Sequence, residues 1–156
     1  MNTHLERLYD HLAWADGLVL DALEKAGTPS EPVLRLLGHL FSAERIWLMR
    51  ARLQDTSKVA VWSPLSLAEC RTVAEESKAG FREIIQQATA DQLAGLIPYR
   101  TSKGQALESA LEDILLHVAL HGAYHRGQIA ALLRREGQEP VSTDFITFAR
   151  SADFQG

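Results

Sequence analysis

The stretch Leu116–Gln128 reads LHVALHGAYHRGQ and holds three of the chain's six histidines, His117, His121 and His125. Their spacing of four residues predicts an α-helix with the imidazoles on one side, because residues i and i+4 lie one turn apart on one face. Two imidazoles so placed can bind a single metal ion. Each step of four residues drifts by about 40° around the helix, so three such histidines cannot address one ion equally. The pair is therefore either His117 with His121 or His121 with His125.

The helix face that carries His121 is mostly apolar, so we expect it to point inward. The same face holds Ile114, Val118, Tyr124 and Leu132. Ionisable groups placed inward need hydrogen-bond partners or a metal, and the alternative to a metal site is a set of buried, hydrogen-bonded histidines. Gly122 and Gly127 interrupt this helix at a cost of about 1 kcal/mol each relative to alanine. Two glycines beside the histidines indicate that some group approaches the backbone closely.

Length and composition are typical of one globular domain, which we expect to span residues 1–156. Hydrophobic residues make up 46% and charged residues 23% of the chain, and the net charge of −4 argues against nucleic acid as a partner. The single cysteine, Cys70, excludes an internal disulfide framework and favours a reducing compartment. No apolar signal region and no run of about 18 apolar residues occurs, so we expect a cytoplasmic protein without a membrane segment.

Four long segments show helical periodicity, and they are expected at 3–25, 31–53, 66–88 and 106–135, with a short last helix at 145–150. Ser30 and Ser66 are expected to cap the second and third helices, the latter in a capping box with Glu69. The connection at 54–65 spans at most about 40 Å, enough to return along a second helix of about 34 Å. Such crossovers occur in some four-helix bundles. Residues 96–105 are expected to form a short hairpin or an irregular loop.

A further histidine, His39, is the lone polar group on the inner face of the second predicted helix, where it accompanies Leu36, Ala43 and Ile46. It is either a hydrogen-bonded core residue or a metal ligand. A histidine pair on another helix favours the ligand, because catalytic zinc sites commonly use three protein ligands and keep one position open. His4 and His11 flank the first apolar stripe and are expected at the surface or its boundary. Four aromatic residues are candidates for either pocket walls or core: Trp14, Trp47, Trp62 and Tyr124.

Three segments carry a resemblance to a known family. The segment HVALHGAYHRGQIAALLRREGQEPVSTDFI resembles the fourth-helix signature of the DinB/YfiT-like family of metal-dependent enzymes. The segments LLGHLFSAERIWL and HLAWADGLVLDAL resemble that family's second and first helices. The resemblance covers essentially the whole chain. It implies an all-α fold, a four-helix bundle in up-down-down-up order, and a homodimer.

Carried over to this sequence, the resemblance implies that His39, His121 and His125 bind a divalent metal ion. It places His117 outside the ligand set, where we expect this side chain to orient the site or to fill the core. Asp113 lies one helical turn before His117, so a hydrogen bond between the two is possible, as ligand histidines often have such outer partners.

The expected chemistry follows from three neutral imidazoles around a divalent ion, which suit zinc or nickel, with iron or another metal possible. Such an ion can acidify a bound water or a bound thiol. We expect a transferase that activates a low-molecular-weight thiol from outside the chain. The alternatives are a hydrolase using metal-bound water and a non-catalytic metal-binding stress-response protein. Hydrolysis needs a general base, and Glu44, the acidic residue nearest His39 in sequence, lies about 140° around the helix from it.

Overall fold

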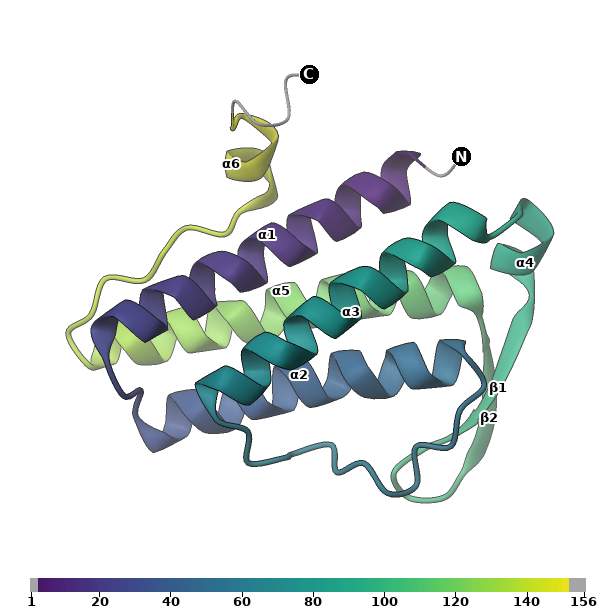
Figure 1. Cartoon of the computed structure of the whole chain (residues 1–156), viewed down its shortest axis with the longest axis horizontal. Helices are drawn as coiled ribbons and strands as arrows, with labels where there is room; N and C mark the ends of the chain where they lie inside the picture. The colour runs from purple at the N-terminus through teal and green to yellow at the C-terminus, as the bar shows by residue number, and fades with distance from the viewer. Residues whose placement is uncertain (1–2, 152–156) are drawn as a thin grey trace.

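The computed structural model describes residues 3–151, and this part of the chain is mostly helical (Figure 1). Its elements are α1 Thr3–Ala26, α2 Glu31–Ala51, α3 Leu67–Gln87, α4 Ala90–Ala94, β1 Leu96–Arg100, β2 Ala106–Ala110, α5 Leu111–Arg135 and α6 Phe145–Ala149. The all-α class expected from the sequence is right in broad terms, with a small two-stranded sheet added. Within residues 3–151, no helix is long and apolar enough to cross a membrane.

The four long helices pack on one another and enclose the core. Helix α2 contacts α5 and α3, and helix α1 contacts α3 and α5. Each helix has an apolar face at helical spacing, and burying these faces against neighbours supplies most of the stability of such helices. One group of buried side chains surrounds Leu20, Leu37 and Phe41, and a second surrounds Phe81 and Leu115. The sites described below lie on the helices that enclose these two groups.

The connection between α2 and α3 runs back alongside α2, so both helices begin near the same end of the molecule (Figure 1). The capping box expected at the start of α3 is confirmed, because the Glu69 backbone N–H donates to Ser66 Oγ at 3.2 Å and the Ser66 N–H donates to Glu69 Oε2 at 2.7 Å. Ser30 is the N-cap residue of α2, as expected, but its side chain makes no capping hydrogen bond. Its hydroxyl donates to the Glu136 carboxylate and makes no bond to the start of α2.

A hairpin precedes the last long helix. Strands β1 and β2 pair antiparallel, with Leu96 opposite Ala110 and Arg100 opposite Ala106. The prediction of a hairpin at 96–105 is therefore right about the type of structure. It is wrong about the position of the second strand, which lies at 106–110. The expected helix start at Ala106 is wrong, because the backbone of residues 106–110 bonds to β1. Helix α5 begins only at Leu111, whose N–H donates to the Gly95 carbonyl oxygen at 3.0 Å.

Candidate metal centre

Helices α2 and α5 bring three histidines together. One nitrogen from each of His39, His121 and His125 lies within 4.8 Å of the others. The Nε2 atoms of His121 and His125 are 3.0 Å apart, and the ring centroids of His39 and His125 are separated by 4.6 Å. Two nitrogens bound tetrahedrally to one zinc at 2.0–2.1 Å lie roughly 3.3 Å apart. The three side chains therefore fit a single divalent ion with small adjustments.

Hydrogen bonds to the far side of two rings prepare them as ligands. The Nδ1 atom of His39 lies 3.0 Å from the Val61 carbonyl oxygen, and Nδ1 of His125 lies 2.7 Å from Gln128 Oε1. Both oxygens are acceptors, so each ring carries its proton on Nδ1 and keeps the Nε2 lone pair for a metal. Gln128 comes from the same helical turn as its histidine, whereas Val61 comes from the long connection. These partners hold ring orientation in the way that outer groups do in metal sites.

The surroundings also favour the neutral form of His121 and His39. The pKa of His121 is lowered to about 4, mainly by burial and in addition by the neighbouring His125, His39 and His117. Burial lowers the pKa of His39 as well, partly opposed by its bond to Val61. A metal ligand must present an unprotonated nitrogen. Both histidines are accordingly ready to bind a cation at neutral pH.

The segment 61–63 covers His39. The Trp62 ring stacks on the His39 ring, with centroids 3.9 Å apart and an interplanar angle of 11°. This approach depends on Gly38, because a Cβ atom there would lie 2.2 Å from the Ser63 carbonyl oxygen. Reasoning from the sequence missed Gly38. The available signal was a glycine inside a predicted helix, directly before the candidate ligand.

His117 lies beside the three histidines without joining them. Its side chain is exposed, so the expectation that it could fill the core is wrong. Its ring contacts the rings of Trp47 and His121, with centroids 5.1 and 5.4 Å away. Asp113 is exposed, and residues 3–151 include no hydrogen bond between Asp113 and His117. Because the His117 ring contacts the His121 ring, we still predict that His117 orients His121.

Three further residues of α5 carry predictions from the sequence: Tyr124, Gly122 and Gly127. The inward position predicted for Tyr124 is wrong, because the residue is 65% exposed and its ring contacts the His125 ring at a centroid distance of 5.1 Å. The close approach expected at the helical glycines is right for Gly122, where a Cβ would lie 2.9 Å from Arg126 Nη1. It is wrong for Gly127, which has no neighbour within 4 Å of such an atom.

The first helix contributes packing and not ligands. His11, expected at the surface or its boundary, is buried, and its Nε2 lies 2.8 Å from the Thr143 carbonyl oxygen. Trp14 packs against His11 and Phe148, with centroids 5.9 and 5.6 Å away. Trp14 is therefore part of the contact with the C-terminal segment and does not line the histidine site.

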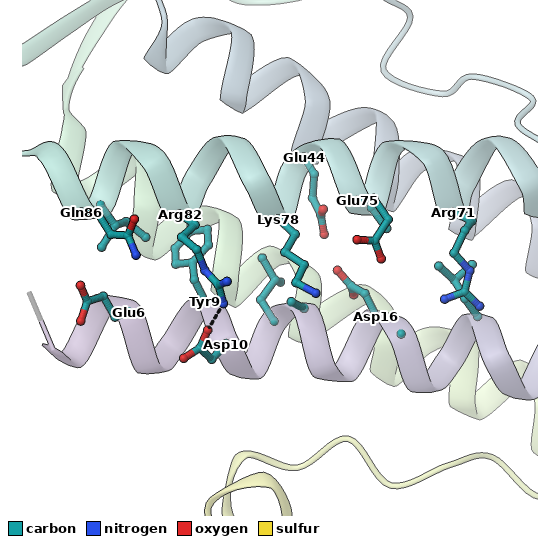
Figure 2. A pocket seen from close by; sticks show the side chains of 16 residues that line it. Glu6, Tyr9, Asp10, Asp16, Glu44, Arg71, Glu75, Lys78, Arg82 and Gln86 are labelled. Atoms are coloured by element: carbon teal, nitrogen blue, oxygen red, sulfur yellow. Dashed lines mark hydrogen bonds and ion pairs between the residues drawn. The ribbon is translucent and has the colours of Figure 1, made fainter. Parts of the chain in front are cut away.

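Glu44 projects into a different cavity, which lies between α1 and α3 (Figure 2). Its carboxyl group points toward that of Asp16, and Asp16 accepts a hydrogen bond of 2.8 Å from buried Arg126. Burial, followed by the neighbouring Asp16 charge, raises the pKa of Glu44 well above its ordinary value. This position agrees with the sequence argument, which places Glu44 about 140° around the helix from His39 and so weakens the case for Glu44 as a base at the histidine site.

The fold and site define a mostly helical protein with a three-histidine cluster that can bind a divalent metal. The model of the DinB family matches residues 1–155, and the chain belongs to this family. It is also similar to Protein DinB of Bacillus subtilis (strain 168). The two are 24% identical over 156 residues, an alignment covering 89% of this chain and 90% of that protein. The family resemblance inferred from three sequence segments is thereby confirmed.

Proposed function

We propose that this protein is a metal-dependent transferase that activates a low-molecular-weight thiol at His39, His121 and His125. The observation that carries the proposal is the composition of the cluster: among residues 3–151, the candidate ligand group contains imidazoles and no carboxylate or thiolate. A divalent ion held by three neutral imidazoles keeps its full charge and, when bound, lowers the pKa of a thiol beside it. Zinc or nickel suits such a donor set best, and iron is a further possibility.

The protein's own thiol is unsuited to this reaction. Cys70 is fully buried in the core, and burial raises its pKa to about 12. A thiol with such a pKa provides very little thiolate at neutral pH. The nucleophile therefore comes from a small molecule. Its sulfur forms a bond to an electrophilic carbon, the leaving group departs with its electron pair, and the thiol proton passes to solvent.

Hydrolysis and metal binding without catalysis are the competing functions for the same ligands. Hydrolysis would require a general base at the site. Glu44 points into the cavity between α1 and α3, where it meets Asp16 instead. This placement supports the transferase over the hydrolase.

We also propose the family's up-down-down-up four-helix bundle and a homodimer. The support for a dimer is an exposed apolar row on α5, made of Leu116, Leu120 and Tyr124 at intervals of four residues. Leu120 and Tyr124 are 69% and 65% exposed. Rows of exposed apolar side chains often mark protein interfaces. Light scattering coupled to size-exclusion chromatography tests this, and a Leu120→Asp variant is expected to shift the mass to that of one chain.

The function is tested by loading the protein with zinc or nickel and adding monochlorobimane with a panel of cellular thiols. The thiol sulfur displaces chloride, and conjugation is followed by fluorescence. We expect catalysis by the wild type, none by His125→Ala, and full activity in His4→Ala, which changes an exposed histidine outside the cluster. Conjugation no faster than that of His125→Ala for every thiol would contradict the transferase. Metal content well below one ion per chain after loading would contradict the metal centre itself.

A further inference from the structure

A large groove lies at the end of α2, and residues of the 54–61 connection and of the β1–β2 hairpin line it. Figure 1 shows these two segments side by side beyond the end of α2. Its volume is about 950 Å³, at the upper end of the range for small-molecule sites. The walls are mainly apolar. Their larger apolar side chains include Ile46, Leu53, Val59, Val61, Pro98 and Leu107. A groove of this size and composition suits a ligand with an apolar body.

Two arginines line this groove, Arg50 and Arg100, and within residues 3–151 neither has a carboxylate partner. The Arg50 guanidinium lies over the rings of Trp47 and Tyr99, with distances of 4.5 and 4.9 Å to their centroids. Its Nη2 donates to the Arg100 carbonyl oxygen at 2.9 Å, while its Nε is buried without a hydrogen-bond partner. Arg50 forms no ion pair within residues 3–151. The rings fix the plane of the guanidinium, and its charge remains unmatched.

The two other charged groups on the walls, Asp55 and Arg100, also make hydrogen bonds within the chain. Asp55, the carboxylate of the groove, accepts from the backbone N–H and the hydroxyl of Ser57, both at 2.9 Å. Arg100 donates from Nη1 to the Gly104 carbonyl oxygen at 3.0 Å. The walls thus carry two arginines and one carboxylate, so their net charge is positive, and Arg50 differs from Arg100 in its contacts with two rings and its buried, unpartnered Nε.

One shared residue and a series of ring contacts connect the groove to the metal centre. Val61 lines the groove, and its carbonyl oxygen holds the His39 ring. Trp47 lies under Arg50 and contacts His117, the neighbour of His121. Arg50 follows His39 by eleven residues on α2, a rise of about 16 Å. Among the described residues no histidine lines this groove, and a ligand that reaches Val61 approaches the metal centre through the residue that holds His39.

We propose that this groove binds a small apolar molecule with a carboxylate or similar anionic group, which Arg50 anchors through charge-assisted hydrogen bonds. Under the proposed function, on which this assignment rests, such a molecule is the electrophilic partner of the thiol. Arginine suits the task because its planar fork binds a carboxylate at two points. The apolar walls hold the remainder of the molecule.

Binding of two matched probes to metal-free protein tests the proposal by isothermal titration calorimetry. The probes are 2-naphthoate and its uncharged counterpart 2-naphthalenemethanol. We expect wild type to bind the naphthoate about tenfold or more tightly, because hydrogen bonds to charged groups contribute about this much. Arg50→Gln removes the preference and Arg50→Lys restores part of it. Arg45→Gln, on the same helix but outside the groove and paired with Glu76, retains it.

A further variant distinguishes the contribution of the apolar wall to probe affinity from that of the Arg50 charge. Leu107→Ala, on β2, is expected to weaken both probes by the same factor, because it removes apolar contact and leaves Arg50 in place. Equal affinity of wild type for the two probes, or a preference that survives Arg50→Gln in a folded variant, would overturn the proposal. Because metal and thiol are absent from this experiment, its failure is distinct from failure of the proposed transferase.

Discussion

Replacing Gly38 by alanine tests how the long connection supports the metal centre. A Cβ atom at this position would lie 2.2 Å from the Ser63 carbonyl oxygen and 3.5 Å from the Leu65 nitrogen. An ordinary carbon–oxygen contact is about 3.3 Å, so the connection must retreat by roughly 1 Å. If residues 61–63 move together, the 3.0 Å separation of His39 Nδ1 and Val61 O grows to roughly 4 Å, beyond hydrogen-bonding range.

The expected energies follow from these displacements. Overpacking costs about 1–3 kcal/mol and the lost hydrogen bond about 1 kcal/mol, while alanine in a helix returns about 1 kcal/mol. The net loss is about 1–3 kcal/mol, or roughly 2–12 °C in Tm for a chain of this length. Zinc affinity is expected to fall about 10–100-fold, because an outer partner of a ligand histidine is removed.

Zinc affinity by competition with a chelator and thermal unfolding of the metal-free protein provide the two readouts. Gly17→Ala is the matched control, since it lies inside α1 with no neighbour within 4 Å of an added Cβ. It should stabilise the protein by up to about 1 kcal/mol and leave zinc affinity unchanged. If Gly38→Ala binds zinc within twofold of wild type, the connection does not orient His39 and the reasoning fails.

Three further perturbations address the same molecule. His117→Asn should leave metal bound with affinity about 10–100-fold lower, whereas His121→Ala should abolish binding; equal, complete metal loss in both would place His117 among the ligands. Burial raises the pKa of Glu44, so the folded protein retains a proton that the unfolded chain releases near pH 4.5. Stability should therefore fall as the pH rises from 4.5 toward the folded pKa, and denaturant titrations of Glu44→Gln should lack this slope. Asp16→Ala leaves the buried Arg126 charge without its 2.8 Å partner and should cost about 3–5 kcal/mol, measured by urea unfolding. A loss below about 1 kcal/mol would mean that another group has replaced Asp16.

Much of the helical framework could be predicted from local patterns. The apolar periodicity located the long helices, and the Ser66 and Glu69 pair located the start of α3. Local patterns failed where pairing with a distant segment decided the outcome. The composition of residues 106–110 is compatible with a helix. Because these residues pair with β1, however, α5 begins only at Leu111. The inward position predicted for Tyr124 was wrong for a related reason. An amphipathic pattern defines a broad apolar arc of the helix, but it does not specify which edge of that arc a neighbouring helix covers.

The sequence by itself determined the histidine spacing on one helix, the family, and a lone histidine on a second helix. Periodicity and motif are local properties, and one chain is enough to read them. Only the tertiary structure decided that the nitrogens of His39, His121 and His125 meet within 4.8 Å, because their distance depends on how α2 packs against α5. It also decided that Val61 and Trp62 hold His39, and that Arg50 faces a groove without a carboxylate partner. These contacts join residues from the long connection, the hairpin and α2, and no local pattern encodes the path by which a connection returns over a helix.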